Sequence, residues 1–362
     1  MLQRKFTTDL SRFLQEEPDK IMLVNGARQI GKSYLIRYVS QQLFANYIEI
    51  NLQEDKEGAR TFANVHSVQD FYVQLGIFAG QRLGSREDTI VFLDEIQAYP
   101  HLLTLLKFLN QDARYRYIAS GSQLGIALKM TPSTPMGSIA IKQMYPLDFE
   151  EFLWAMGANT ESIAAVRAQF EKRESVNESL HDYLLRMFRY YLIVGGMPEA
   201  VNTYVEKKDY RAVRKVQNEI LKSYKNDFSN HPPKEIVKRM LLLWDSIPGQ
   251  LAKENKKFQF SVVRKGGRSA QYIGSIQWLE DAGLVRRCYN TQITELPLEG
   301  NSIKDCFKLY TTDIGLLVAM LDYGTQADIL KGNLLGYKGA IFENLMADFL
   351  CKSGQKLYYF QK

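Results

Sequence analysis

The sequence predicts an N-terminal α/β domain whose mostly parallel sheet is covered by helices on both faces. Short apolar runs of strand length recur through the first 145 residues, and helix-like or loop sequence separates each run from the next. Strands that alternate with helices in this way are typical of a parallel sheet. Beyond residue 150 the pattern becomes helical and highly charged, and then mixed, so further domains are expected.

The elements of the first domain follow from the spacing of apolar residues. An amphipathic helix is predicted over residues 2–16, because apolar residues there recur near helical spacing. Strands are predicted from short apolar runs at residues 21–24, 47–50, 90–93, 117–119 and 139–141. The domain is expected to end near Tyr145-Pro146-Leu147, and it is assigned to residues 1–150.

Three further segments are predicted after the first domain. Residues 151–245 form a helical lid or linker, interrupted at Gly195-Gly196-Met197-Pro198. Residues 246–292 show short helices around a basic turn and then a strand, which is the order of a winged helix-turn-helix. Residues 293–362 predict a partial α+β domain with a helix near 341–350 and a last strand at 357–360.

Composition narrows the class of protein. The chain is 46% hydrophobic and 24% charged, which is typical of soluble globular proteins, and no apolar run approaches the roughly 18 residues of a membrane helix. No signal peptide is visible at the N-terminus. Three scattered cysteines neither form a disulfide framework nor show a metal-ligand spacing, which favours the cytoplasm. The net charge of +6 permits contact with nucleic acid without arguing for it.

A phosphate-binding motif follows the first predicted strand. The pattern G-x-x-x-x-G-K-[ST] is met at every fixed position, and a helix follows directly. Glycines let the backbone wrap a phosphate, and the N–H groups of the loop and helix start then point inward. Lys32 is expected to reach the β- and γ-phosphates of a nucleotide and Ser33 to ligate magnesium. The alternative is an ordinary glycine-rich turn. The predicted nucleotide-binding residues are Gly26, Ala27, Arg28, Gln29, Ile30, Gly31, Lys32, Ser33 and Tyr34.

Two carboxylates end the third predicted strand, at Asp94 and Glu95. Asp94 is predicted to hold magnesium together with Ser33, and Glu95 to polarise the attacking water as general base. On its own, the pair would be read as an acidic helix cap after a core strand; the phosphate motif favours the catalytic interpretation.

The next predicted strand ends in Ser120-Gly121-Ser122-Gln123. If this strand is inserted between the strands that carry the two motifs, its end lies beside the γ-phosphate. Ser120 is then the candidate polar sensor, with Ser122 or Gln123 as substitutes, and it joins Lys32 and Glu95 as a predicted catalytic residue. A simple strand-to-loop turn explains the same residues.

At this point the sequence resembles prokaryotic AAA-type P-loop ATPases whose C-terminal domain is winged-helix and nuclease-like and of unknown function. The segments that carry the resemblance run through nearly the whole chain in the family's order. They are residues 26–33, 92–97, 119–122, 145–152, 194–199, 310–317 and 342–344.

The resemblance implies ATP as the nucleotide, Mg²⁺ as its partner ion and a C-terminal half similar to PD-(D/E)XK nucleases. The family's helix glutamate aligns with Glu343. The remaining acids of such a site usually follow the Tyr358-Tyr359 region, and the sequence ends at Lys362 before any of them. Because two carboxylates and a lysine are needed to hold the metal and activate water, nuclease activity is not expected of this chain.

One family arginine is missing. Relatives typically carry it near Met136-Gly137-Ser138, where this chain has Ser138. If it acts as a finger on a neighbour's γ-phosphate, turnover is expected to be slow or to use Arg28 or another chain, within a homo-oligomer.

Three uses of ATP stay open. Nucleotide state can gate binding of DNA or RNA by the winged helix, through Arg264, Lys265, Arg268 and the neighbouring Lys256-Lys257. The same cluster fits a solvated face of a protein-packing module, and the chain is then an ATP-switched interaction protein. The third possibility is an ATP-gated nuclease completed by residues beyond Lys362.

Overall fold

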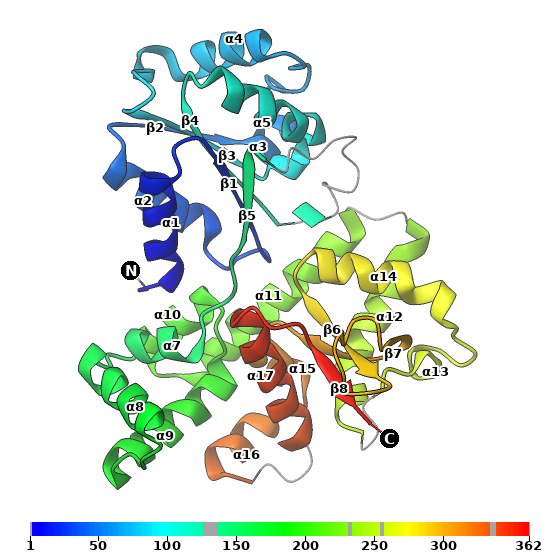
Figure 1. The fold of residues 1–362 in the computed structure, drawn as a ribbon. Coiled ribbons are helices and arrows are strands. Elements are labelled where there is room, and N and C mark those ends of the chain that lie inside the picture. Colours follow the sequence, from blue (N-terminus) through cyan, green and yellow to red (C-terminus); the bar gives the residue numbers. More distant parts are fainter. Residues whose placement is uncertain are drawn as a thin grey trace. The chain divides into compact units, whose positions relative to one another are not determined.

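The computed structural model describes residues 2–122, 124–125, 137–230, 234–253, 257–333 and 338–361. The chain divides into two compact units (Figure 1). One consists of Arg4–Met144 with Asp281–Gly283, and we call it the α/β unit. The other consists of Tyr145–Glu280 and Leu284–Lys362 with Met1–Gln3, and we call it the helical unit. Each is described by itself below.

The α/β unit is built on a five-stranded parallel sheet with the order β2-β3-β4-β1-β5. Every predicted strand is present, so the predicted parallel α/β core is confirmed. The strands are β1 (Ile21–Asn25), β2 (Asn46–Asn51), β3 (Thr89–Asp94), β4 (Arg116–Gly121) and β5 (Ile139–Gln143). All six residues of β3 are buried, as expected of a strand inside a covered parallel sheet.

Strand register brings the predicted motifs to one edge of the sheet. Asn25 of β1 pairs with Gly121 of β4, and Leu93 of β3 pairs with Ala119 of β4. β4 therefore lies between β1 and β3, the arrangement that the interpretation of Ser120 requires. Because the strands are parallel, their carboxyl ends open at the same edge, where ligands bind in open α/β sheets.

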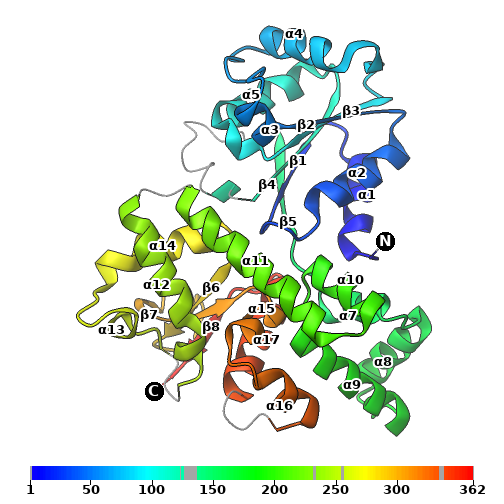
Figure 2. The ribbon, with the colours of Figure 1, turned by 180° about the vertical axis from the view of Figure 1, so that it is seen from behind.

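Helices cover both faces of the sheet, as predicted (Figures 1 and 2). On one face lie α3 (Leu52–Glu57), α4 (Val68–Ala79) and α5 (Pro100–Asp112), and on the other α1 (Lys5–Glu16) and α2 (Lys32–Leu43). The short 3-10 helices η1 (Gly80–Arg82) and η2 (Ile96–Ala98) follow α4 and β3.

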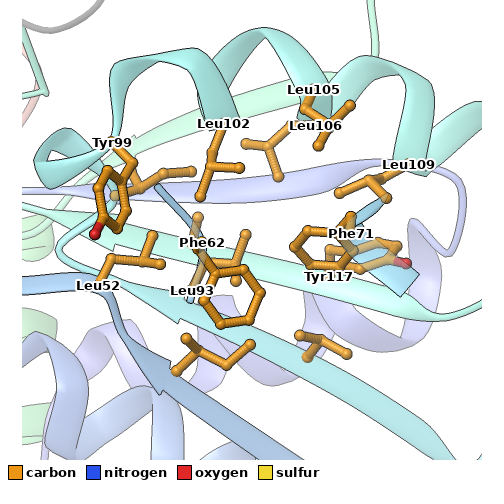
Figure 3. Packing of buried hydrophobic residues seen from close by; sticks show 14 of the residues in the cluster. Leu52, Phe62, Phe71, Leu93, Tyr99, Leu102, Leu105, Leu106, Leu109 and Tyr117 are labelled. Atoms are coloured by element: carbon orange, nitrogen blue, oxygen red, sulfur yellow. The ribbon is translucent and has the colours of Figure 1, made fainter. Parts of the chain in front are cut away.

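The core beneath α4 and α5 is aliphatic and aromatic (Figure 3). Pro100 occupies the first turn of α5, where its missing N–H costs nothing. Leu102, Leu106 and Leu109 then recur at helical spacing and pack toward the sheet with Phe71. Each such side chain contributes about 1.5–3 kcal/mol when fully buried, so this layer fixes the strand ends that carry the polar motifs.

The helical unit begins with a run of helices and ends in a small mixed sheet, which confirms the coarse prediction for the rest of the chain. Its helices are α7 (Phe149–Ala155), α8 (Thr160–Lys172), α9 (Glu178–Val194), α10 (Pro198–Lys207), α11 (Tyr210–Asn230), α12 (Lys234–Leu251), α13 (Phe260–Val263), α14 (Ser269–Asp281), α15 (Ile314–Met320), α16 (Thr325–Lys331) and α17 (Lys338–Lys352). Its strands are β6 (Val285–Thr291), β7 (Ser302–Thr311) and β8 (Tyr358–Phe360). β6 pairs antiparallel with β7 and parallel with β8. The predicted boundary between residues 245 and 246 falls inside α12.

Two family segments distant in sequence meet inside the helical unit. The buried Asp313 carboxylate accepts hydrogen bonds from the N–H of Gly196 at 2.7 Å and of Leu316 at 2.8 Å. A Cβ on Gly196 would lie 2.0 Å from the carbonyl oxygen of Leu147. The glycine is required because two backbone segments approach closely there, and Asp313 caps α15 at the same junction.

Candidate functional site

The glycine-rich loop joins β1 to α2, as its motif predicts. A Cβ on Gly26 would lie 2.5 Å from the carbonyl oxygen of Met144, so only glycine fits there. Gly31, at the N-cap of α2, has φ of 91°, which favours glycine. Both fixed glycines of the motif are therefore required by the local backbone geometry. The N–H groups of the first turn of α2 follow directly and form a favourable place for an anion.

Lys32 is folded over this loop. Its side chain is buried, and Nζ donates to the carbonyl oxygens of Gly26 at 3.0 Å and Ala27 at 2.9 Å. Burial lowers the pKa of Lys32, while the nearby Glu95 and Asp94 carboxylates oppose that shift. The loop thus holds a poorly solvated cation at the point where a phosphate chain would approach.

Asp94 ends β3 with a buried carboxylate. It accepts hydrogen bonds from the hydroxyls of Ser120 and Ser33 and from the N–H of Glu95 at 3.0 Å. Burial raises the pKa of Asp94, and the two serine hydroxyls act against that shift. Ser33 and Asp94 line one cavity of about 770 Å³. The predicted pair of metal ligands is therefore in direct contact.

Glu95 lies one residue further, in a left-handed backbone conformation with φ of 53°. Its half-buried carboxylate accepts a hydrogen bond from Ser122 Oγ at 3.2 Å and another from the side-chain amide of Gln97. Arg28 Nε donates to the same Ser122 hydroxyl at 3.4 Å. A chain of hydrogen bonds therefore links the glycine-rich loop to Glu95.

Two of these placements refine the sequence interpretation. Ser120 contacts Asp94, whereas Ser122 contacts Glu95, so the two serines act on different carboxylates. Sequence reasoning gave Gln97 no role, although it lies in a segment that carries the family resemblance. Its position two residues after Glu95, three residues beyond the end of β3, was the available signal. Gln123 lies outside the described residues.

Other loop residues serve packing or lie exposed. The Ile30 side chain is fully buried, and its carbonyl oxygen accepts from Arg4 at 3.2 Å, so only its backbone is available to a ligand. The buried Ala27 and the exposed Gln29 continue the loop, and Tyr34 on α2 is 55% exposed. Ser138, at the position where the family resemblance implies an arginine, accepts a backbone hydrogen bond from Ile21 at 2.9 Å. Met136 lies outside the described residues.

The basic turn of the helical unit is exposed. Arg264, Lys265 and Arg268 lie between α13 and α14, and each has an exposed side chain. Lys257 precedes α13, and Lys256 lies outside the described residues.

Glu343 on α17 is engaged within the helical unit. Its Oε1 accepts from Lys308 Nζ at 2.6 Å and from the Tyr310 hydroxyl at 2.7 Å. Across the described ranges, no group of three or more His, Cys, Asp or Glu residues is arranged to hold a metal ion. Within the same ranges, no helix combines the length and the apolar character needed to cross a bilayer.

Two family models match parts of the chain. Residues 18–153 match the family described as AAA domain, and residues 185–327 match a domain of unknown function (DUF8612). None of the curated proteins matches the chain.

Among solved structures, the Walker-type ATPase PABY2304 of Pyrococcus abyssi is similar, with a TM-score of 0.53 at 16% identity, over 88% of this chain and 96% of that one. The Aeropyrum pernix Orc1 protein in complex with DNA gives a TM-score of 0.34 at 13% identity, over 91% of each chain. The Thermotoga maritima RuvB Holliday junction branch migration motor gives a TM-score of 0.34 at 13% identity, over 79% of this chain and 90% of that one. The first likeness concerns the fold alone, and the other two scores are too low to support an argument.

The glycine-rich loop, the carboxylates at the end of β3 and the strand order agree with the match of residues 18–153 to an AAA domain. The chain joins this domain to a C-terminal domain of unknown function, and the predicted family resemblance is confirmed at that level.

Proposed function

We propose that the α/β unit binds ATP with Mg²⁺ and hydrolyses it. One observation carries the proposal: the buried Asp94 carboxylate contacts Ser33 in the first turn of α2, beside a lysine folded over the glycine-rich loop. A hydroxyl and a carboxylate oxygen are the ligands that Mg²⁺ takes in nucleotide sites, so the residues present fit this ion. Ser33 and Asp94 would hold the ion, which would neutralise charge on the phosphates when bound.

The loop residues have separate tasks in this proposal. Backbone N–H groups from Ala27 to Tyr34 surround the β-phosphate, and Lys32 exchanges its two carbonyl partners for phosphate oxygens. The charge of a phosphate chain would raise the lowered pKa of Lys32 and so favour its charged form. The match to the AAA family favours ATP over GTP as the nucleotide. The sequence also has no Asn-Lys-x-Asp motif, which recognises guanine.

Glu95 accepts the proton of the attacking water. Its carboxylate is held by Ser122 and Gln97, which fixes the direction in which the free oxygen atom points. Ser120 orients Asp94 from the neighbouring strand, and Arg28 connects the loop to Ser122. Proton transfer by a positioned base contributes roughly 10²–10⁴ in rate.

Lys32→Ala tests the proposal. We expect it to weaken ATP binding at least 100-fold, because a buried charge-assisted contact to phosphate is lost. Isothermal titration with Mg-ATP measures the affinity. Lys56→Ala, which removes an exposed lysine of α3, is the matched control and should bind as wild type does. Equal affinity in Lys32→Ala and wild type would refute the assigned site.

We also propose that nucleotide state controls binding of a partner by the helical unit, with nucleic acid as the first candidate. Three helices, α12, α13 and α14, followed by the antiparallel pair β6 and β7, are the order of a winged helix. The exposed Arg264, Lys265 and Arg268 precede α14, where phosphate contacts are favourable. The alternative partner is a protein.

A titration with double-stranded DNA across salt concentrations, with ATP or ADP present, distinguishes these partners. Nucleic acid is supported if affinity falls steeply as salt rises, and if the triple variant Arg264→Ala/Lys265→Ala/Arg268→Ala makes this dependence on salt weaker. Binding that is absent in both nucleotide states would favour a protein partner.

A further inference from the structure

A basic groove lies between two helices of the helical unit, outside the winged-helix segment and the basic turn. It has a volume of about 770 Å³ and is lined by one face of α11 together with Tyr323 and residues of α16. The α11 positions are 210, 211, 214, 215, 218, 219 and 222. Intervals of three and four residues place all seven on one side of the helix.

The charge of this face is strongly positive. Arg211, Arg214, Lys215 and Lys222 contribute four cations against the one carboxylate of Glu219. In the described part of the chain, neither Arg211, Lys215 nor Lys222 forms an ion pair, and all three are exposed. The stripe from Arg211 to Lys222 is about 16 Å long, at 1.5 Å per residue. Its length and spacing suit an extended anionic ligand better than a single ion.

Arg214 forms the floor of the groove and is only 8% exposed. Its two terminal nitrogens donate to the carbonyl oxygens of Val318 at 3.0 Å and Leu321 at 2.9 Å. Its Nε is buried and has no hydrogen-bond partner within the described ranges, and the same holds for Gln326 Nε2. Both atoms are donors, so the groove offers two unused buried donors to an acceptor-rich ligand.

An aromatic ring stands beside these donors. The Tyr323 side chain is 85% exposed, and the Arg214 guanidinium lies 5.3 Å from its ring centroid. An exposed ring next to a line of cations is the combination with which proteins bind single-stranded nucleic acid, because phosphates meet the cations and bases stack on the ring. An acidic peptide would meet the cations equally well but would leave the ring without a planar partner.

We propose that this groove binds a short segment of single-stranded nucleic acid, with phosphates along α11 and one base stacked on Tyr323. This binding is independent of the P-loop, since the ligand is a phosphodiester and needs no triphosphate. It is also separate from the proposed role of Arg264, Lys265 and Arg268, because none of these lines the groove.

The test uses the full chain and fluorescein-labelled ten-nucleotide oligo(dT) and oligo(U), followed by fluorescence anisotropy at several salt concentrations. In Arg211→Ala/Lys215→Ala/Lys222→Ala, three phosphate contacts are lost. The salt slope of log K should then fall by about 2, which corresponds to about a 100-fold loss of affinity at 0.1 M salt.

The matched control, Lys172→Ala/Arg189→Ala/Lys207→Ala, removes the same charge from three exposed positions on α8, α9 and α10 and should bind as wild type does. Tyr323→Ala should lower the affinity for the oligonucleotide about tenfold, because the stacking of a base on the ring is lost. Phe170→Ala, which removes another exposed aromatic ring, should lose nothing.

Four results would overturn the proposal. The first is a wild-type chain that binds neither oligonucleotide. The second is a groove variant that binds like its control. The third is a loss of oligonucleotide binding only in Arg264→Ala/Lys265→Ala/Arg268→Ala, which would place the oligonucleotide at the basic turn instead. The last is competition by poly-glutamate, or by ATP in a Lys32→Ala background, as effective as that by unlabelled oligonucleotide. Failure of ATP binding in the wild type would leave these measurements unaffected.

Discussion

Ser120→Ala removes one hydrogen bond from the centre of the proposed nucleotide site. The Ser120 side chain is fully buried at the carboxyl end of β4, and its hydroxyl donates to Asp94 Oδ1. Alanine keeps the strand and the Cβ, so the change is confined to one hydroxyl. Asp94 retains the Ser33 hydroxyl and the N–H of Glu95.

The magnitude follows from these contacts. A hydrogen bond to a charged group contributes roughly 1.5–3 kcal/mol, and the two remaining donors favour the lower end of that range. We therefore expect the free energy of unfolding to fall by about 1.5 kcal/mol. Because the Ser120 hydrogen bond lowers the pKa of Asp94, its loss also makes the carboxylate harder to ionise and a weaker metal ligand.

Two assays measure the effect: thermal unfolding without nucleotide, and ATP hydrolysis titrated with Mg²⁺. Ser120→Ala should lower Tm and raise the Mg²⁺ concentration needed for half-maximal activity about tenfold. Ser122→Ala is the matched control, because Ser122 contacts Glu95 and not Asp94. It should slow turnover at saturating Mg²⁺ and leave the Mg²⁺ requirement unchanged. An unchanged Tm and Mg²⁺ requirement in Ser120→Ala would refute the reasoning.

Two further substitutions test the loop and the carboxylate. Gly26→Ala should abolish ATP binding and destabilise the α/β unit by about 1–3 kcal/mol, because the new Cβ meets the backbone of Met144. Gly137 has open space around it, so Gly137→Ala is the control and should leave the stability measured by calorimetry unchanged. Asp94→Asn should stabilise the nucleotide-free chain by on the order of 1 kcal/mol at pH 7 while weakening Mg-ATP binding. Folding raises the pKa of Asp94 from its ordinary value near 3.8, so wild-type stability falls as pH rises from about 3.8 through the raised pKa of the folded state. The stabilisation by Asp94→Asn, measured in denaturant titrations, should therefore vanish below pH 3.8. A gain in stability that persists at such low pH would contradict the buried-charge account.

The strands and the motif residues could be predicted from the sequence because their signals are local. A buried strand such as β3 is a continuous apolar run, and the glycines of the loop are fixed by backbone geometry at Gly26 and Gly31. The order of the strands was anticipated only through the interpretation of Ser120. Periodicity alone does not tell which strands are neighbours, since hydrogen bonding between strands is not local.

The contacts around Glu95 and in the groove on α11 could not be predicted. Which serine meets which carboxylate depends on strand register and on the left-handed conformation of Glu95. The cations of α11 were visible in the sequence as charges on a helix. Their partner Tyr323 lies about a hundred residues away, and only the packing of α15 and α16 brings it to Arg214.

The most direct test of the central claim is single-turnover hydrolysis of pre-bound ATP by Glu95→Gln. The amide keeps the size of the side chain and can still accept a hydrogen bond from Ser122, but it cannot take a proton. The account predicts ATP affinity within about threefold of wild type and hydrolysis slowed at least 100-fold. Hydrolysis at the wild-type rate would show that the carboxylate after β3 is not the base.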